Sequence, residues 1–114
     1  MSPISRLIKD YYDRLVAAGY DVIDISPRQY KSPVIAIGSH DDDAASHKNG
    51  AATFKTTIQI DYFCDTEVGR YAIEDEVCRI KNTLRQRNIT SRLMIDKSLQ
   101  KELYHVVFEV STYI

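Results

Sequence analysis

The sequence predicts the α+β fold class: one antiparallel sheet of about four to five strands, two helices packed on one face, and a long β-hairpin arm. Residues 3–18 and 66–87 have the apolar spacing of amphipathic helices. Residues 53–64 and 102–113 alternate apolar and polar side chains, as half-buried strands do. Because 114 residues provide one modest hydrophobic core, we expect a single domain over residues 1–114.

The helix at residues 3–18 has recognisable start and stop signals. Ser2 offers a cap, and Pro3 stands at the first helical position, where its missing N–H is harmless. Gly19 stands where a helix commonly stops. The apolar stripe comprises Ile4, Leu7, Ile8, Tyr11, Leu15 and Val16. This stripe predicts the side of the helix that packs on the sheet.

The strands are expected at about residues 20–25, 33–38, 53–64, 91–97 and 102–113. In the strand 53–64, one face holds Phe54, Thr56, Ile58, Ile60, Tyr62 and Cys64. The other face is polar and holds Lys55, Thr57, Gln59 and Asp61. In the last strand, His105 and Glu109 fall on the polar face. Long strands with one polar face are typical of an antiparallel sheet that is wet on one side.

The second helix, at residues 66–87, is expected to begin at a cap provided by Asp65 or Thr66. Its C-terminal half is basic, through Arg79, Lys81, Arg85 and Arg87. This charge complements the helix dipole. Acidic residues occupy positions 74–76 just before it, and mixed charge along a helix favours a solvated face over a nucleic-acid site.

Composition disfavours several function classes. Fifteen basic and sixteen acidic residues leave a net charge of −1, which gives no electrostatic footprint for nucleic acid. No apolar window approaches the length of a membrane span or a signal peptide, so we expect a cytoplasmic protein without a membrane partner. Cys64 and Cys78 are then expected to be reduced thiols that pack as small apolar residues.

The sequence carries no recognisable catalytic motif. It has no glycine-rich phosphate loop, no CxxC, no GxSxG and no helical pair of zinc-binding histidines. His105 could approach Cys64 as a base, but the rest of a nucleophilic site is missing. We therefore predict that the protein is not an enzyme and needs no cofactor.

Residues 38–52 read GSHDDDAASHKNGAA and are the one stretch rich in metal-binding side chains. A zinc or iron site could draw on His40, His47 and one carboxylate from 41–43, but these ligands are adjacent in sequence and lack a fourth anchor. The spacing does not match a calcium loop. Small polar residues are typical of a loop tip, so we expect a projecting loop at 39–52 and no metal.

The order of elements and two short motifs resemble a known family. The strand motif PVIAIG occupies residues 33–38, and QIDYF occupies residues 59–63 of the long strand that follows the polar loop. With the flanking helices and the closing pair of strands, this pattern resembles the small tail-terminator and tail-completion proteins of long-tailed bacteriophages. The resemblance covers nearly the whole chain.

The resemblance implies a structural role in a virion. Such proteins form a ring, usually a hexamer, that caps the tail tube, stops its polymerisation and joins it to the connector or stopper proteins of the head. Genomic DNA passes through the lumen without being read. The expected partners are therefore other copies of the chain, the tail tube protein and the head–tail connector, first in the host cytoplasm and then in the virion tail or neck.

The resemblance also implies which residues make contacts. The arm would contact a neighbouring subunit or the tube through His40, Asp41, Asp42, Asp43, His47 and Lys48. Sheet-edge assembly would involve Lys55, Thr57, Gln59, Asp61, His105 and Glu109, because an exposed strand edge is a template for another chain. Three alternatives stay open: another neck component such as a head–tail joining or stopper protein, a small metal-dependent module, and a monomeric binding domain.

Overall fold

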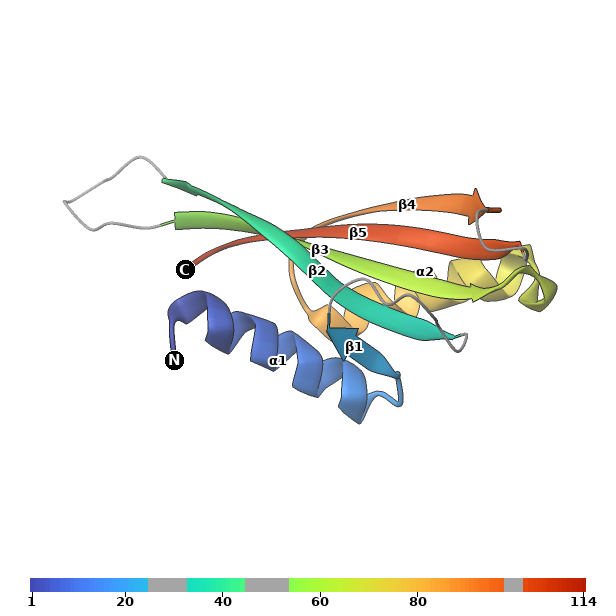
Figure 1. Ribbon diagram of the computed structural model, residues 1–114, viewed down its shortest axis with the longest axis horizontal. Helices are drawn as coiled ribbons and strands as arrows, with labels where there is room; N and C mark the ends of the chain where they lie inside the picture. The colour runs from blue at the N-terminus through green and yellow to red at the C-terminus, as the bar shows by residue number, and fades with distance from the viewer. Residues whose placement is uncertain (25–32, 45–53, 98–101) are drawn as a thin grey trace.

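The computed structural model describes residues 1–24, 33–44, 54–97 and 102–114. The elements are α1 (Pro3–Ala17), β1 (Val22–Asp24), β2 (Val34–Ala44), β3 (Phe54–Asp65), the 3₁₀ turn η1 (Thr66–Val68), α2 (Arg70–Leu84), β4 (Asn88–Asp96) and β5 (Leu103–Tyr113). The strands form one five-stranded sheet in the order β1-β2-β3-β5-β4 (Figure 1). The predicted α+β class, with two helices on one sheet, is confirmed.

The sheet is mixed, whereas the sequence predicted it to be wholly antiparallel. β2, β3, β5 and β4 pair antiparallel, but β1 runs parallel to β2, with Val22 opposite Ile35. A strand of three residues is too short for its side-chain pattern to reveal a direction. Residues 25–32, which connect the two strands, lie outside the described part of the chain.

The capping signals of α1 act as predicted. The Ser2 hydroxyl accepts a hydrogen bond from the Ser5 backbone N–H at 3.1 Å, and Pro3 occupies the first helical position. Gly19 follows the helix with φ 94°, a left-handed conformation that glycine adopts without strain. Tyr11 and Leu15 are fully buried, which confirms the centre of the predicted apolar stripe.

The helix predicted at 66–87 is broken into two pieces. Asp65 caps η1 by accepting a hydrogen bond from the Glu67 N–H at 3.0 Å. Gly69 then adopts φ 86° and ψ 165°, a region almost restricted to glycine, and α2 starts after it. At its other end α2 stops at Leu84, because Arg85 turns left-handed with φ 56° and ψ 31°.

The strand ends also differ from the prediction. β2 continues to Ala44, so the projecting loop predicted at 39–52 is wrong for residues 39–44, while 45–52 lie outside the described residues. Polar residues hold a strand here because their backbone groups pair with β3, up to Ala44 opposite Phe54, while side chains can stay in water. β4 begins at Asn88, earlier than the predicted residue 91, for the same reason: it pairs with β5 from its first residue.

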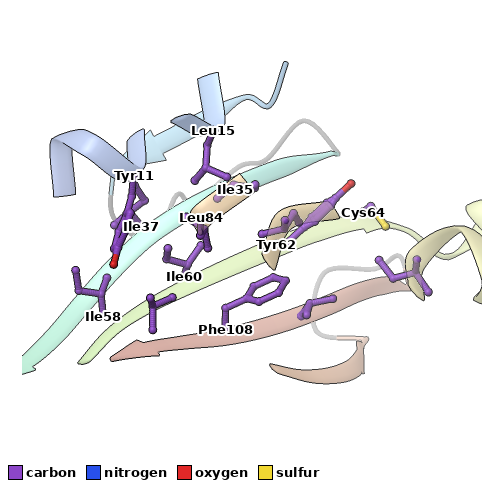
Figure 2. Packing of buried hydrophobic residues seen from close by; sticks show 14 residues of the cluster. Tyr11, Leu15, Ile35, Ile37, Ile58, Ile60, Tyr62, Cys64, Leu84 and Phe108 are labelled. Carbon is purple, nitrogen blue, oxygen red and sulfur yellow. The ribbon is translucent and has the colours of Figure 1, made fainter. Parts of the chain in front are cut away.

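The hydrophobic core lies between the helices and one face of the sheet. α1 contributes Tyr11 and Leu15, and α2 contributes Ile73, Ile80 and Leu84. The buried strand residues are Ile35, Ile37, Ile58, Ile60, Tyr62, Cys64, Val106, Phe108 and Val110 (Figure 2). The apolar face predicted for the strand 53–64 is thus confirmed where its side chains are described. The opposite side of the sheet has no described helix on it and is called the uncovered face below, although Val34, Ala36 and Phe63 on this side are buried.

Candidate functional site

The acidic residues that follow PVIAIG form a strand extension, defined here as residues 39–44. The register between β2 and β3 shifts between Ile37 and His40, so Gly38 and Ser39 together face Gln59 in a β-bulge. A Cβ at position 38 would lie 3.4 Å from the Gln59 backbone oxygen, so a side chain there would sit in close contact with β3. Before this bulge the odd-numbered side chains of β2, such as Ile37, face the helices, and after it the even-numbered side chains do.

The bulge separates the three aspartates. Asp42 lies opposite Thr56 on the helix side of the sheet, whereas Asp41 and Asp43 lie opposite Thr57 and Lys55 on the uncovered face. The carboxylates therefore do not converge on one point. No group of metal-ligating side chains forms within the described residues, and His47 and Lys48 lie outside them.

Asp42 anchors the extension locally. Its carboxylate accepts a hydrogen bond from the Thr56 hydroxyl at 2.5 Å and lies 3.1 Å from His40 Nδ1. The Thr56 hydrogen bond, with a smaller contribution from His40, holds the pKa of Asp42 below its ordinary value. Asp41 and Asp43 are exposed, and among the described residues their carboxylates have no hydrogen bond or ion pair.

The residues predicted for sheet-edge assembly share the uncovered face but not an edge. Gln59 lies opposite Glu109, and Phe63 lies opposite His105. β3 is flanked by β2 and β5, and β5 by β3 and β4, so both strands have hydrogen-bonded neighbours on both sides. The expectation that these strands offer free edges is therefore wrong. The free edges of the described sheet belong to β1, to β4 and to the part of β2 after Ile37, which β1 does not reach.

The uncovered face has an ordered polar centre. His105 Nε2 lies 2.8 Å from Asp61 Oδ1, with side chains only 20% and 13% exposed. The His105 ring stacks on Phe63 at a centroid distance of 4.3 Å. Phe63 was not among the predicted contact residues, although its apolar side chain at a polar-face position of QIDYF is a signal visible in the sequence.

This pair is not a nucleophilic site. Cys64 lies on the helix side of the sheet, so its thiol does not face His105. Burial raises the pKa of Cys64 to about 11, which keeps the thiol protonated near neutral pH. The Asp61–His105 contact instead fixes the position of two polar side chains on a face that a protein partner can contact.

A second surface feature lies between the helices, at the basic end of α2 that was predicted to be a solvated face. A groove of about 720 Å³ separates the C-terminal ends of α1 and α2, and we call it the arginine groove. Its lining residues are Arg14, Ala17, Ala18, Asp75, Cys78, Arg79, Asn82, Thr83 and Arg85. The two helices bring together arginines that lie far apart in sequence, which no local pattern could indicate.

The fold and its surfaces define a small α+β protein with an acidic strand extension and one sheet face free of helices. No protein-family model matches the chain, and no curated protein matches it. Among solved structures, the chain is similar to a chain in the virion of a native gene transfer agent particle. The TM-score is 0.55 at 15% identity, over 95% of this chain and 92% of that chain. At this identity the likeness shows a shared fold. No helix in the described residues is long and apolar enough to cross a membrane.

Proposed function

We propose that the protein is a non-catalytic structural component of a phage-like virion, and that it forms a tail-terminator or tail-completion ring. The observation that carries this proposal is the similarity to a virion chain over nearly the full length of both chains. The long strand extension and the uncovered sheet face support it, because each offers a surface for a protein neighbour.

In this role, copies of the chain assemble into a closed ring, expected to be a hexamer, at the head-proximal end of the tail tube. The ring stops tube polymerisation and presents a surface to the head connector, and DNA passes through its lumen. The net charge of −1 suits such a conduit, because a strongly basic lumen would retain DNA. A different neck position, such as a head–tail joining or stopper protein, is the second candidate, because the similar chain belongs to a whole virion.

Assembly assays test the proposal directly. The protein is purified and its mass measured by light scattering, and it is then added to tail tube protein from the same genome during tube polymerisation. We expect rings in negative-stain micrographs, shorter tubes, and density of the protein at one tube end. Binding to purified connector with no effect on the tubes would favour the joining or stopper role. A protein that neither assembles nor binds tube or connector would refute both.

A further inference from the structure

The arginine groove is held in shape by two of its own arginines. Arg14 of α1 donates from Nη1 to the backbone oxygen of Leu84, at the end of α2. Arg79 of α2 donates from Nη2 to the backbone oxygen of Ala18, just after α1, at 2.6 Å. Both guanidinium groups also have a carboxylate partner on their own helix: Asp10 lies 2.8 Å from Arg14 Nη2, and Glu76 lies 3.5 Å from Arg79 Nη1. These two arginines therefore shape the groove, and most of their charge is balanced within the chain.

Arg85 is the third arginine of the groove, and its backbone forms the C-cap of α2. Its side chain is exposed and makes no hydrogen bond or ion pair among the described residues. Its backbone is left-handed at φ 56°, and it is the one non-glycine residue with positive φ in the described chain. Glycine is the usual residue at this position after a helix, because a Cβ is disfavoured there. An arginine held in an unfavourable backbone conformation points to a use for its side chain.

The acidic extension is the complementary surface on the same chain. Asp41 and Asp43 are exposed and lack ion-pair partners among the described residues. The extension and the groove lie at opposite ends of α1: Ile37, just before the bulge, shares a pocket with Met1 and Ser5, whereas Ala17 and Ala18 line the groove. α1 has 15 residues and so spans about 22 Å. Figure 1 shows the paired ends of β2 and β3 toward the same end of the molecule as the N-terminus.

We propose that Asp41 and Asp43 of one protomer dock into the arginine groove of a second copy. Guanidinium and carboxylate groups form strong paired hydrogen bonds, and Arg85 is the groove arginine that has no carboxylate partner among the described residues. Asp75 in the groove disfavours a polyanion such as DNA, but it leaves room for a short acidic segment. Because different surfaces meet, the contact is head-to-tail, the kind that closes into rings. This inference rests on the proposed ring and names the contact that closes it.

Charge reversal tests the contact. Arg85→Glu should weaken self-association at least tenfold in analytical ultracentrifugation, and Asp43→Arg should do the same. Mixing the two variants, or combining both changes in one chain, should restore association. Arg92→Glu is the matched control, because Arg92 is an exposed arginine on β4, outside the groove, that also has no ion pair among the described residues. A second variant, Arg85→Gly, removes the charge and relieves the left-handed backbone, so its Tm should rise by a few degrees while association weakens.

Cross-linking tests proximity independently. Cys78 is exposed in the groove and Cys64 is buried, so a short bismaleimide should join Cys78 of one copy to an Asp43→Cys variant of another. Glu109→Cys, on the uncovered face, should give no such product. A labelled duplex oligonucleotide is titrated in parallel, and we expect no binding that depends on Arg85.

The outcomes separate this contact from the ring proposal. If the wild-type protein forms rings that cap tubes, and both charge-reversal variants form the same rings, the proposed contact alone is refuted. Arg85-dependent binding of the oligonucleotide, without loss of self-association, would also refute it. Association through the groove by a protein that never caps tubes would refute the terminator role and uphold the contact. A chain that stays monomeric at high concentration and gives no cross-link would overturn the contact, and if it also neither caps tubes nor binds connector, the proposed function is overturned as well.

Discussion

Replacing Tyr11 or Tyr20 by phenylalanine tests hydrogen bonding in the core, because the two variants should change the free energy of unfolding in opposite directions. Tyr11 is fully buried, and its hydroxyl is the one buried side-chain polar atom without a hydrogen-bond partner in the described residues. Tyr20, by contrast, donates its hydroxyl to the Glu76 carboxylate at 2.7 Å. An unpaired buried polar group costs roughly 1–3 kcal/mol, and a hydrogen bond to a charged group contributes roughly 1.5–3 kcal/mol.

The magnitudes follow from what each oxygen contacts. Tyr11→Phe keeps the ring and its packing and removes only the unpaired hydroxyl, so we expect a gain of about 1 kcal/mol, the lower end of that range. Tyr20→Phe removes a real hydrogen bond, but Glu76 keeps Arg79 as a partner at 3.5 Å. We therefore expect a loss of about 1 kcal/mol. Each change corresponds to a Tm shift of roughly 3–6 °C for a domain of this size.

Urea unfolding followed by circular dichroism at neutral pH measures both free energies of unfolding. All variants are compared in the same oligomeric state, because association shifts apparent stability. A loss of 1 kcal/mol or more for Tyr11→Phe would refute the reasoning. It would mean that the hydroxyl has a partner in the folded protein, and Gln86, which lies close enough to affect the pKa of Tyr11, would be the first candidate.

Three further predictions concern the thiols and the backbone. At pH 8, a maleimide should modify exposed Cys78 at least tenfold faster than Cys64, because burial raises the pKa of Cys64 to about 11. Mass spectrometry of digests taken at timed intervals measures the two rates, and equal rates would contradict the prediction. Stability should fall as the pH rises from roughly 8.5, the pKa of an unfolded thiol, to about 11, because the unfolded chain releases the Cys64 proton at a lower pH than the folded chain does. Urea unfolding midpoints at pH 8 and pH 10 measure this loss, which should be smaller in the Cys64→Ala variant. Gly69→Ala should lower the free energy of unfolding by about 1–3 kcal/mol, because residues other than glycine rarely adopt φ 86° and ψ 165°, even though a Cβ there would meet no atom within 4 Å. An unchanged melting curve would show that the chain between η1 and α2 can rearrange.

The features predicted correctly from the sequence are those encoded by neighbouring residues. Ser2, Pro3 and Gly19 mark the ends of α1 through local backbone chemistry, and the structure confirms all three. Alternation along β3 likewise predicted its buried face, including Thr56, which is fully buried although polar. Such signals act over a few residues, so they can be read without knowing the fold.

The features missed depend on partners that are distant in sequence. The extension at 39–44 has the composition of a loop and becomes a strand only because β3 provides partners for its backbone hydrogen bonds. The place of β3 and β5 in the middle of the sheet, and of β4 at its edge, is likewise set by long-range pairing. The bulge at Gly38 and Ser39 inverts which aspartates face the helices, and an alternation pattern carries no sign of it.

The arginine groove shows how such long-range pairing creates a surface from residues with ordinary local roles. The last carbonyls of a helix lack intrahelical partners, so donors near a helix end are stabilising. Here each helix end is capped by the other helix: Arg14 reaches Leu84, 70 positions away, and Arg79 reaches Ala18, 61 positions away. The reciprocal caps hold two guanidinium groups in one groove, and Arg85 adds a third that makes no hydrogen bond or ion pair among the described residues. Because Arg14 and Arg79 are already ordered by these bonds, docking of the proposed acidic segment would cost little side-chain entropy at these two residues.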